Sequence, residues 1–143
     1  MKWRLFVLSL LLAAGSASAG NEALIYTVQL VRGTDQKQPP EQGAKAVSAA
    51  VGERLGRFRW KHYWEIRREA VPVTSQRPAK LQLSKDRGLG LELVGEDHVE
   101  MHLYRDGKLV RTARQKIQSD SYEIMGGHDK DDSWFVVVRR KPH

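Results

Sequence analysis

The part of the chain that follows Lys80 contains no helical pattern, only short alternating segments separated by turn residues. Leucines occupy every second position over residues 89–93, and apolar residues alternate with polar ones over residues 99–103. A period of two places the apolar side chains on one face of a β-strand. Short strands that follow one another at this spacing pair in the antiparallel sense, so this feature restricts the C-terminal part of the chain to antiparallel sheet.

The residues between and within these segments indicate how the strands are placed. Asp106-Gly107 stands between two of them and is typical of a two-residue hairpin turn. Arg111 and Arg114 favour an edge position for the return strand over residues 109–115. The apolar run WFVVVRR at residues 134–140 favours a central position for the last strand.

The part before Lys80 predicts a strand, a helix and a second strand. Residues 23–32 are rich in β-branched and aromatic side chains, as strands are. Apolar residues recur at steps of three and four over residues 41–55, which predicts a helix. A period of two over residues 58–68 predicts a long strand with one solvated face. We expect a buried face made of Phe58, Trp60, His62, Trp64 and Ile66, and a solvated face made of Arg59, Lys61, Tyr63, Glu65 and Arg67.

This order of elements predicts an α+β fold, in which one N-terminal helix packs on a twisted, mainly antiparallel sheet of about 6–8 strands. The chain has 143 residues, of which 41% are hydrophobic and 29% charged, and this composition is ordinary for a single globular domain. It contains no cysteine, which excludes a disulfide framework, a thiolate metal site and a cysteine nucleophile.

The first 19 residues have the features of a secretory signal peptide. Lys2 and Arg4 precede an apolar run of about ten residues, and Ala17-Ser18-Ala19 supplies the small residues that signal peptidase accepts. The run is shorter than the roughly 20 residues that cross a membrane. We therefore expect a signal peptide at residues 1–19, a single domain at residues 20–143, and a periplasmic or secreted protein. Cleavage would leave a net charge of +5, because it removes two of the 24 basic residues and none of the 17 acidic ones.

Catalytic and metal-binding motifs are absent from the sequence, which has no GxSxG, HExxH, GxGxxG or P-loop pattern. His62 lies between two tryptophans, a setting more typical of a core histidine than of a catalytic base. On a strand, His98 and His102 would lie about 13 Å apart, too far for one metal ion. The acidic loop at residues 126–132 lacks the spacing of an EF-hand and is typical of a hairpin tip. We expect no catalytic residue, no metal and no cofactor.

Basic side chains are the strongest indication of a binding surface. Arg59, Lys61 and Arg67 share one face of the predicted strand over residues 58–68, and Arg139 and Arg140 lie in the last strand. If these two strands are neighbours, the five side chains form one positive face. We expect the partner of this face to be an acidic envelope protein or an anionic surface, and not a nucleic acid. The alternative is a solvated face that keeps the protein in solution.

Together these features predict a small exported binding or interaction module of the cell envelope, without catalytic activity. One alternative is a small envelope hydrolase or lyase that uses a histidine and carboxylates that the sequence does not identify. Glu65 and Glu69, or Glu92 and Glu100, are pairs of the kind that a glycosidase uses. Another alternative is an inhibitor of a secreted enzyme, which only the predicted architecture suggests. A pocket that holds His62 with two carboxylates would favour the enzyme. An exposed apolar patch or an uncovered sheet edge would favour the interaction module.

Overall fold

The computed structural model describes residues 22–126 and 132–142, so the predicted signal peptide at residues 1–19 lies outside the described residues. The elements, in chain order, are β1 (Leu24–Thr34), β2 (Lys45–Ala46), α1 (Ala49–Leu55), β3 (His62–Val73), β4 (Ala79–Gln82), β5 (Arg87–Val94), β6 (His98–Arg105), β7 (Lys108–Lys116), β8 (Glu123–Gly126) and β9 (Trp134–Arg140).

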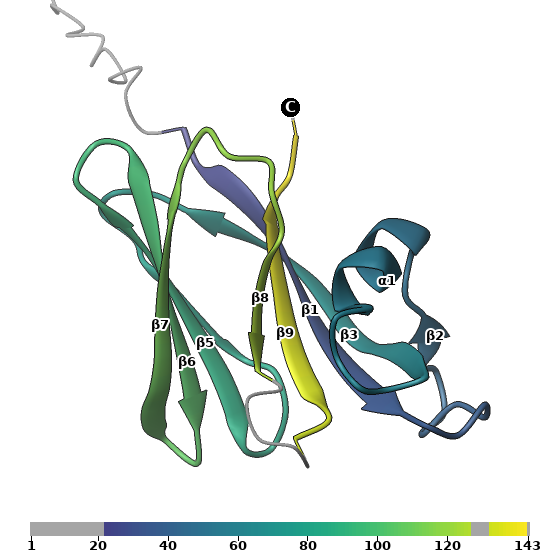
Figure 1. Ribbon diagram of the computed structural model, residues 1–143. Coiled ribbons are helices and arrows are strands. Elements are labelled where there is room, and N and C mark those ends of the chain that lie inside the picture. The colour runs from purple at the N-terminus through teal and green to yellow at the C-terminus, as the bar shows by residue number, and fades with distance from the viewer. Residues whose placement is uncertain (1–21, 127–131, 143) are drawn as a thin grey trace, which may run out of the picture.

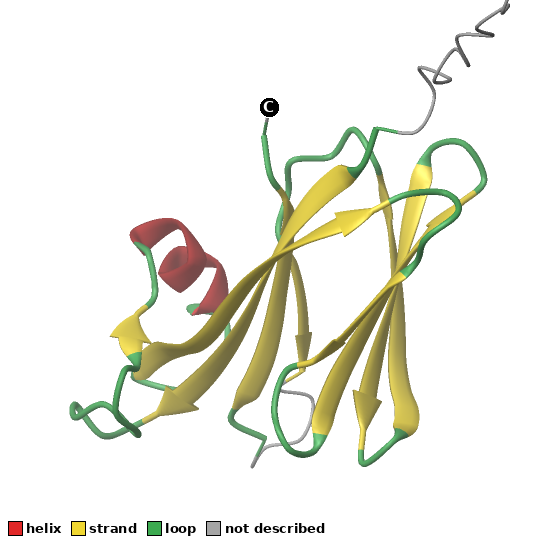
Figure 2. Cartoon of the chain, turned by 180° about the vertical axis from the view of Figure 1, so that it is seen from behind, coloured by secondary structure: helices red, strands yellow, loops and turns green. Residues whose placement is uncertain are grey.

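The strands form two antiparallel sheets rather than one. The first has five strands in the order β2-β3-β1-β9-β8, and the second has four in the order β4-β5-β6-β7 (Figure 1). Figure 2 shows the two sheets facing each other, with α1 on the side of the five-stranded sheet that is turned away from the other sheet. The predicted α+β fold, with a helix covering a single sheet, is therefore wrong, since the chain is mostly β and α1 has only seven residues.

The main hydrophobic core lies between the two sheets, and the burial of apolar strand faces there is the reason the strands form two sheets. Each of β5 and β6 has one apolar face, and a sheet of this kind buries that face against another sheet. The residues that meet there are Tyr26, Val28 and Leu30 of β1, Leu89 and Leu91 of β5, Val99, Met101 and Leu103 of β6, and Val136 and Val138 of β9. A seven-residue helix is too short to cover so many apolar side chains.

A second, smaller core lies between α1 and the outer face of the five-stranded sheet. Val51 and Leu55 of α1 pack with Val31, Phe135 and Val137 of the two central strands. Strands β1 and β9 are thus apolar on both faces, as expected for central strands. The predicted central position of the last strand is confirmed, because β9 lies between β1 and β8.

The helix is shorter than the one predicted over residues 41–55. Gly43 has a φ of +85°, which the helix cannot contain, and β2 then pairs with β3. The helix begins only after Ser48, whose hydroxyl accepts a hydrogen bond of 3.3 Å from the Val51 backbone N–H. The apolar spacing of three and four residues before Ser48 therefore does not correspond to a helix.

The strand predicted over residues 58–68 begins instead at His62 and contains an irregularity that the alternation does not reveal. Leu30 pairs with Arg67 and Val31 with Glu65, so a β-bulge at Ile66 changes which side chains share a face. Ile66 packs toward the main core as predicted. Arg67, predicted on the opposite face, also reaches the four-stranded sheet, where it donates a hydrogen bond of 3.0 Å to the Gln82 carbonyl.

Trp60 and Tyr63 also lie elsewhere than predicted. Trp60 precedes β3 and packs against the smaller core between α1 and the five-stranded sheet, which we call the α1 core. Its indole covers Gly33 so closely that a Cβ on Gly33 would lie 2.5 Å from the ring. Tyr63, expected in solvent, has its ring centre 5.7 Å from that of Phe135 in the same core. Trp60 and Tyr63, predicted on opposite faces of the strand, therefore both pack against the α1 core.

The hairpin prediction at Asp106-Gly107 is confirmed. Asp106 has a φ of +51° and Gly107 a φ of +76°, and Arg105 pairs with Lys108 across the turn. Two successive positive φ angles define the type I′ turn that suits the twist of a hairpin. The turn fixes the start of β7.

Candidate functional site

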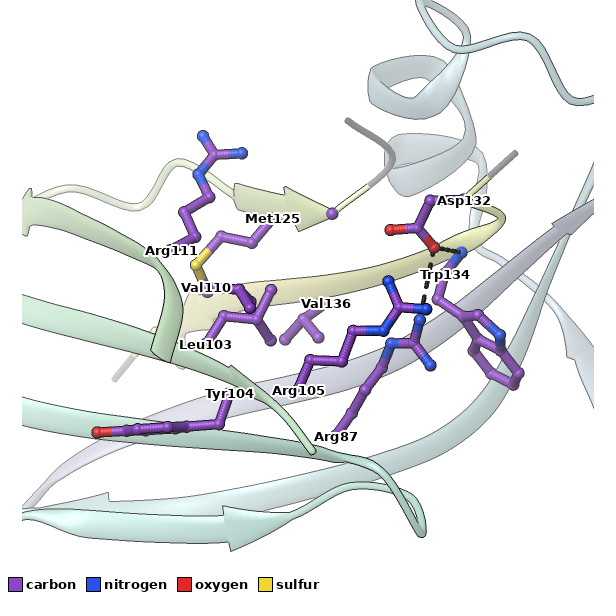
Figure 3. A pocket seen from close by; sticks show the side chains of 11 residues that line it. Arg87, Leu103, Tyr104, Arg105, Val110, Arg111, Met125, Asp132, Trp134 and Val136 are labelled. Carbon is purple, nitrogen blue, oxygen red and sulfur yellow. Dashed lines mark hydrogen bonds and ion pairs between the residues drawn. The ribbon is translucent and has the colours of Figure 1, made fainter. Parts of the chain in front are cut away.

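A cavity of about 200 Å³ lies between the two sheets at the end where β5 and β9 begin and β6 and β8 end (Figure 3). Its wall is apolar in the middle and charged at the rim. The apolar part consists of Leu103, Val110, Met125 and Val136. The cavity is smaller than the roughly 300–1,000 Å³ typical of small-molecule sites, so it suits a short chain or a single side chain.

Arg87 is the buried charged group at the rim of this cavity, with only 8% of its surface exposed. Its guanidinium lies 3.2 Å from Asp86 Oδ2, 3.5 Å from Asp132 Oδ1 and 5.3 Å from the centre of the Trp134 ring. Asp132 Oδ1 also accepts a hydrogen bond of 3.1 Å from the Trp134 backbone N–H. A hydrogen bond from the Ser84 hydroxyl, aided by the charge of Arg87, lowers the pKa of Asp86. These contacts hold the guanidinium in place at the rim.

Two further arginines flank the mouth of the cavity. Arg105, the last residue of β6, has an exposed side chain that forms no hydrogen bond or ion pair with the described residues, and its charge helps to lower the pKa of Asp86. Figure 3 shows its guanidinium beside that of Arg87, on the side of Asp132. Arg111 of β7 lines the other side and points past Met125. Among the described residues, three arginines and two aspartates lie at or beside this rim.

Strand β7 forms an edge of the four-stranded sheet and pairs, among the described residues, only with β6. Leu109 is 53% exposed and Val110 55% exposed, the large hydrophobic side chains that stand out on the described surface. The far end of β7 is partly covered, because the Gln115 amide donates a hydrogen bond of 3.0 Å to the Ser121 carbonyl. The open stretch is therefore residues 108–112, which we call the open edge.

A β-bulge connects the open edge with the cavity. Leu103 pairs with Arg111 and Tyr104 with Leu109, which leaves Val110 as the extra residue on β7. A bulge bends its strand and redirects side chains. Here Val110 and Arg111, although adjacent in sequence, both line the cavity. The same short segment therefore offers an unpaired backbone edge and part of a cavity wall.

The five basic residues predicted to form one face lie in three places. Strand β1 separates β3 from β9, so these strands are not neighbours. Arg59 and Lys61 precede β3 near Asp35, whose carboxylate lies 3.9 Å from Arg59 and accepts a hydrogen bond from the Lys61 N–H.

The other three are bound to the backbone or to aromatic side chains. Arg67 contacts β4, Arg140 donates to the Ile117 carbonyl at 2.8 Å, and Arg139 donates to the Tyr122 hydroxyl at 2.9 Å. Their binding role stays a prediction, but they do not share one face.

The described histidines, His62, His98 and His102, and the glutamate pair do not line the cavity. Glu92 and Glu100 pair across the outer face of the four-stranded sheet. Hydrogen bonds from Arg114 lower the pKa of Glu100, whereas a general acid at neutral pH needs a raised pKa. His102 Nε2 lies 3.1 Å from Glu100 Oε1 in a geometry that makes no hydrogen bond. Within the described part of the chain, no three histidine or acidic side chains are placed to hold one metal ion.

Two sequence predictions lie partly outside the described residues. The acidic loop at residues 126–132 is described only at its two ends, Gly126 and Asp132. No helix within residues 22–126 and 132–142 is long and apolar enough to cross a membrane.

Comparison with known proteins gave no match: no protein-family model, no curated protein and no solved structure is significantly similar to the chain. The geometry of the open edge and the cavity must therefore support any proposed function.

The sequence contains one indication of the cavity, the position of Arg87. Arg87 precedes Leu89 and Leu91 at a spacing of two, so the alternation that buries these leucines also turns Arg87 inward. An arginine in phase with buried leucines indicates a cation inside the fold. The contributions of Trp134 and Asp132 depend on which strands meet, and no local pattern shows this.

Proposed function

We propose that the chain is an exported, non-catalytic binding module that adds an acidic, extended segment of a partner protein to the open edge of β7. The observation that carries this proposal is the open edge itself, a stretch of strand with no hydrogen-bonded strand on one side among the described residues and with two exposed apolar side chains. Features of residues 1–19 support the export.

An uncovered strand offers a row of backbone N–H and C=O groups to another extended chain. Main-chain hydrogen bonds supply affinity in such strand addition, and the side chains beside the edge supply specificity. Leu109 and Val110 would pack against apolar residues of the added strand, as cross-strand neighbours do.

The basic side chains of β7 determine which strands can pair with the open edge. Strand β7 carries the basic residues Lys108, Arg111, Arg114 and Lys116 and no acidic residue. Like charges opposite each other destabilise a strand pair, so two copies of β7 repel each other, whereas an acidic strand is attracted. The same charges thus protect the edge from self-association and select the partner.

Fluorescence anisotropy with a labelled eight-residue peptide of alternating glutamate and valine tests the proposal. We expect saturable binding that weakens as salt is raised, because exposed charges are screened within about 8–10 Å at physiological ionic strength. A lysine–valine peptide should not bind. A glutamate–valine peptide with one central proline should bind much more weakly, because proline cannot donate to the new ladder.

Two charge reversals distinguish the open edge from the basic residues predicted by sequence. Lys108→Glu should weaken binding of the glutamate–valine peptide about fivefold, the effect of roughly 1 kcal/mol. Lys61→Glu, at a distant exposed position, should leave binding unchanged. The reverse pattern would place the binding surface near Arg59 and Lys61, and equal binding of the proline peptide would overturn strand addition.

A further inference from the structure

We propose that the cavity between the sheets binds a carboxylate carried on a short apolar stem. The stem would lie against Leu103, Val110 and Val136, and the carboxylate would meet the guanidinium groups of Arg87 and Arg105 at the rim. This site does not depend on strand addition at β7, because its cation and most of its apolar wall come from other strands.

The rim is preorganised for an anion. Arg87 is buried and held between Asp86 and Asp132, so it needs little ordering when a ligand arrives. Arg105 stands beside it without a hydrogen bond or ion pair from the described residues, and its five N–H donors match the geometry of a carboxylate. A carboxylate would accept hydrogen bonds from the exposed Arg105 guanidinium.

The apolar wall adds a second requirement. A small inorganic anion would leave Leu103, Val110 and Val136 against water, whereas a hydrocarbon stem would cover them and gain from burial. The volume of about 200 Å³ limits this stem to a few carbons. The chemistry fits a free short-chain carboxylate and equally a carboxylate on a side chain or C-terminus of a bound protein segment.

The test uses the protein with ¹³C-labelled methionine methyl groups and sodium hexanoate as the probe. The chain has three methionines. Met125 lines the cavity, and Met101 lies in the main core and serves as an internal control. We expect the Met125 methyl resonance to shift saturably with hexanoate and the Met101 resonance to move little.

Matched ligands and variants separate charge from apolar contact. Hexanamide, the neutral analogue, and acetate, which lacks the stem, should each bind at least tenfold more weakly than hexanoate. Arg105→Gln should weaken hexanoate binding to a similar extent, while Arg57→Gln, at an exposed position beside Phe58 and outside β7, should not. Arg105 is exposed, so its replacement leaves the fold intact where replacement of Arg87 would not.

The outcomes are distinct. If the glutamate–valine peptide also shifts Met125 and competes with hexanoate, the carboxylate belongs to a protein segment. If only hexanoate acts, the ligand is a free carboxylate. An unmoved Met125, or equal binding of hexanoate and hexanamide, would overturn the proposal. Peptide binding that protects β7 in a protein whose Met125 resonance moves with neither the peptide nor hexanoate would support the proposed function and reject the cavity site.

Discussion

At the scale of single residues, Gly126 has the most constrained backbone beside the cavity. Its φ is +107°, and a Cβ at this position would lie 2.3 Å from the Trp134 carbonyl oxygen. We expect Gly126→Ala to lower the free energy of unfolding by about 1–3 kcal/mol or more, because strain and a backbone clash combine. Gly95→Ala, with φ +62° but open space, should cost about 1 kcal/mol. Equal losses in urea melts would show that the clash is relieved elsewhere.

Glu65 provides a test of pH dependence. Burial raises the pKa of its carboxyl, but hydrogen bonds from Gln29 and Arg68 outweigh this and lower the pKa below its ordinary value of 4.5. A carboxyl with a lowered folded pKa stabilises the fold fully above its unfolded pKa and loses that contribution as the pH falls through the folded pKa. We expect Glu65→Gln to cost about 1 kcal/mol at pH 7, from the charged hydrogen bonds lost.

Urea titrations of both proteins between pH 7 and pH 3 measure this effect. The difference in unfolding free energy between the natural protein and Glu65→Gln should shrink as the pH falls below 4.5. A difference that stays constant over this range would mean that the carboxylate is not stabilised by its partners.

At the scale of elements, helix α1 is short and contains a glycine, Gly52, which lowers its stability. A Cβ at Gly52 would lie 3.7 Å from Val47 Cγ2, an ordinary contact, and the residue has a helical backbone. We therefore expect Gly52→Ala to raise the free energy of unfolding by about 0.4–1 kcal/mol. Gly43→Ala, where φ is +85°, should lower it instead. Thermal melts of the two variants should move in opposite directions.

Sequence patterns predicted the strands well because each depends on its own alternation and turns. The hairpin at Asp106-Gly107, the edge position of β7 and the central position of β9 all follow from local residues, whereas β2 lies inside the predicted helix. The bulges opposite Leu30 and at Val110 do not, because they are extra residues relative to a partner strand. Each bulge changes which side chains share a face.

The division into two sheets and the cavity could not be predicted for a related reason. Alternation shows that a strand has an apolar face but not which strand that face meets. Trp134 and Arg87 approach each other only because β9 and β5 belong to opposed sheets. The basic residues predicted as one face are separated because β1 lies between their strands.

At the scale of the whole molecule, the two cores share β1 and β9, so they should unfold together. Three tryptophans, Trp60, Trp64 and Trp134, lie on or beside the five-stranded sheet, whereas Met101 lies on the four-stranded sheet. We expect urea transitions followed by tryptophan fluorescence and by the Met101 methyl resonance to coincide, as in a two-state domain. Separate midpoints would mean that the sheets are independent folding units.

The open edge of β7 is the centre of the proposed function, and backbone amide hydrogen exchange measures it directly. In the complex with the glutamate–valine peptide, amides within residues 108–112 that exchange quickly in the free protein should slow at least tenfold, because new ladder hydrogen bonds protect them. The edge strands β4 and β8 should keep their exchange rates. Protection at β4 or β8, or peptide binding with no slowing at β7, would contradict strand addition at this edge.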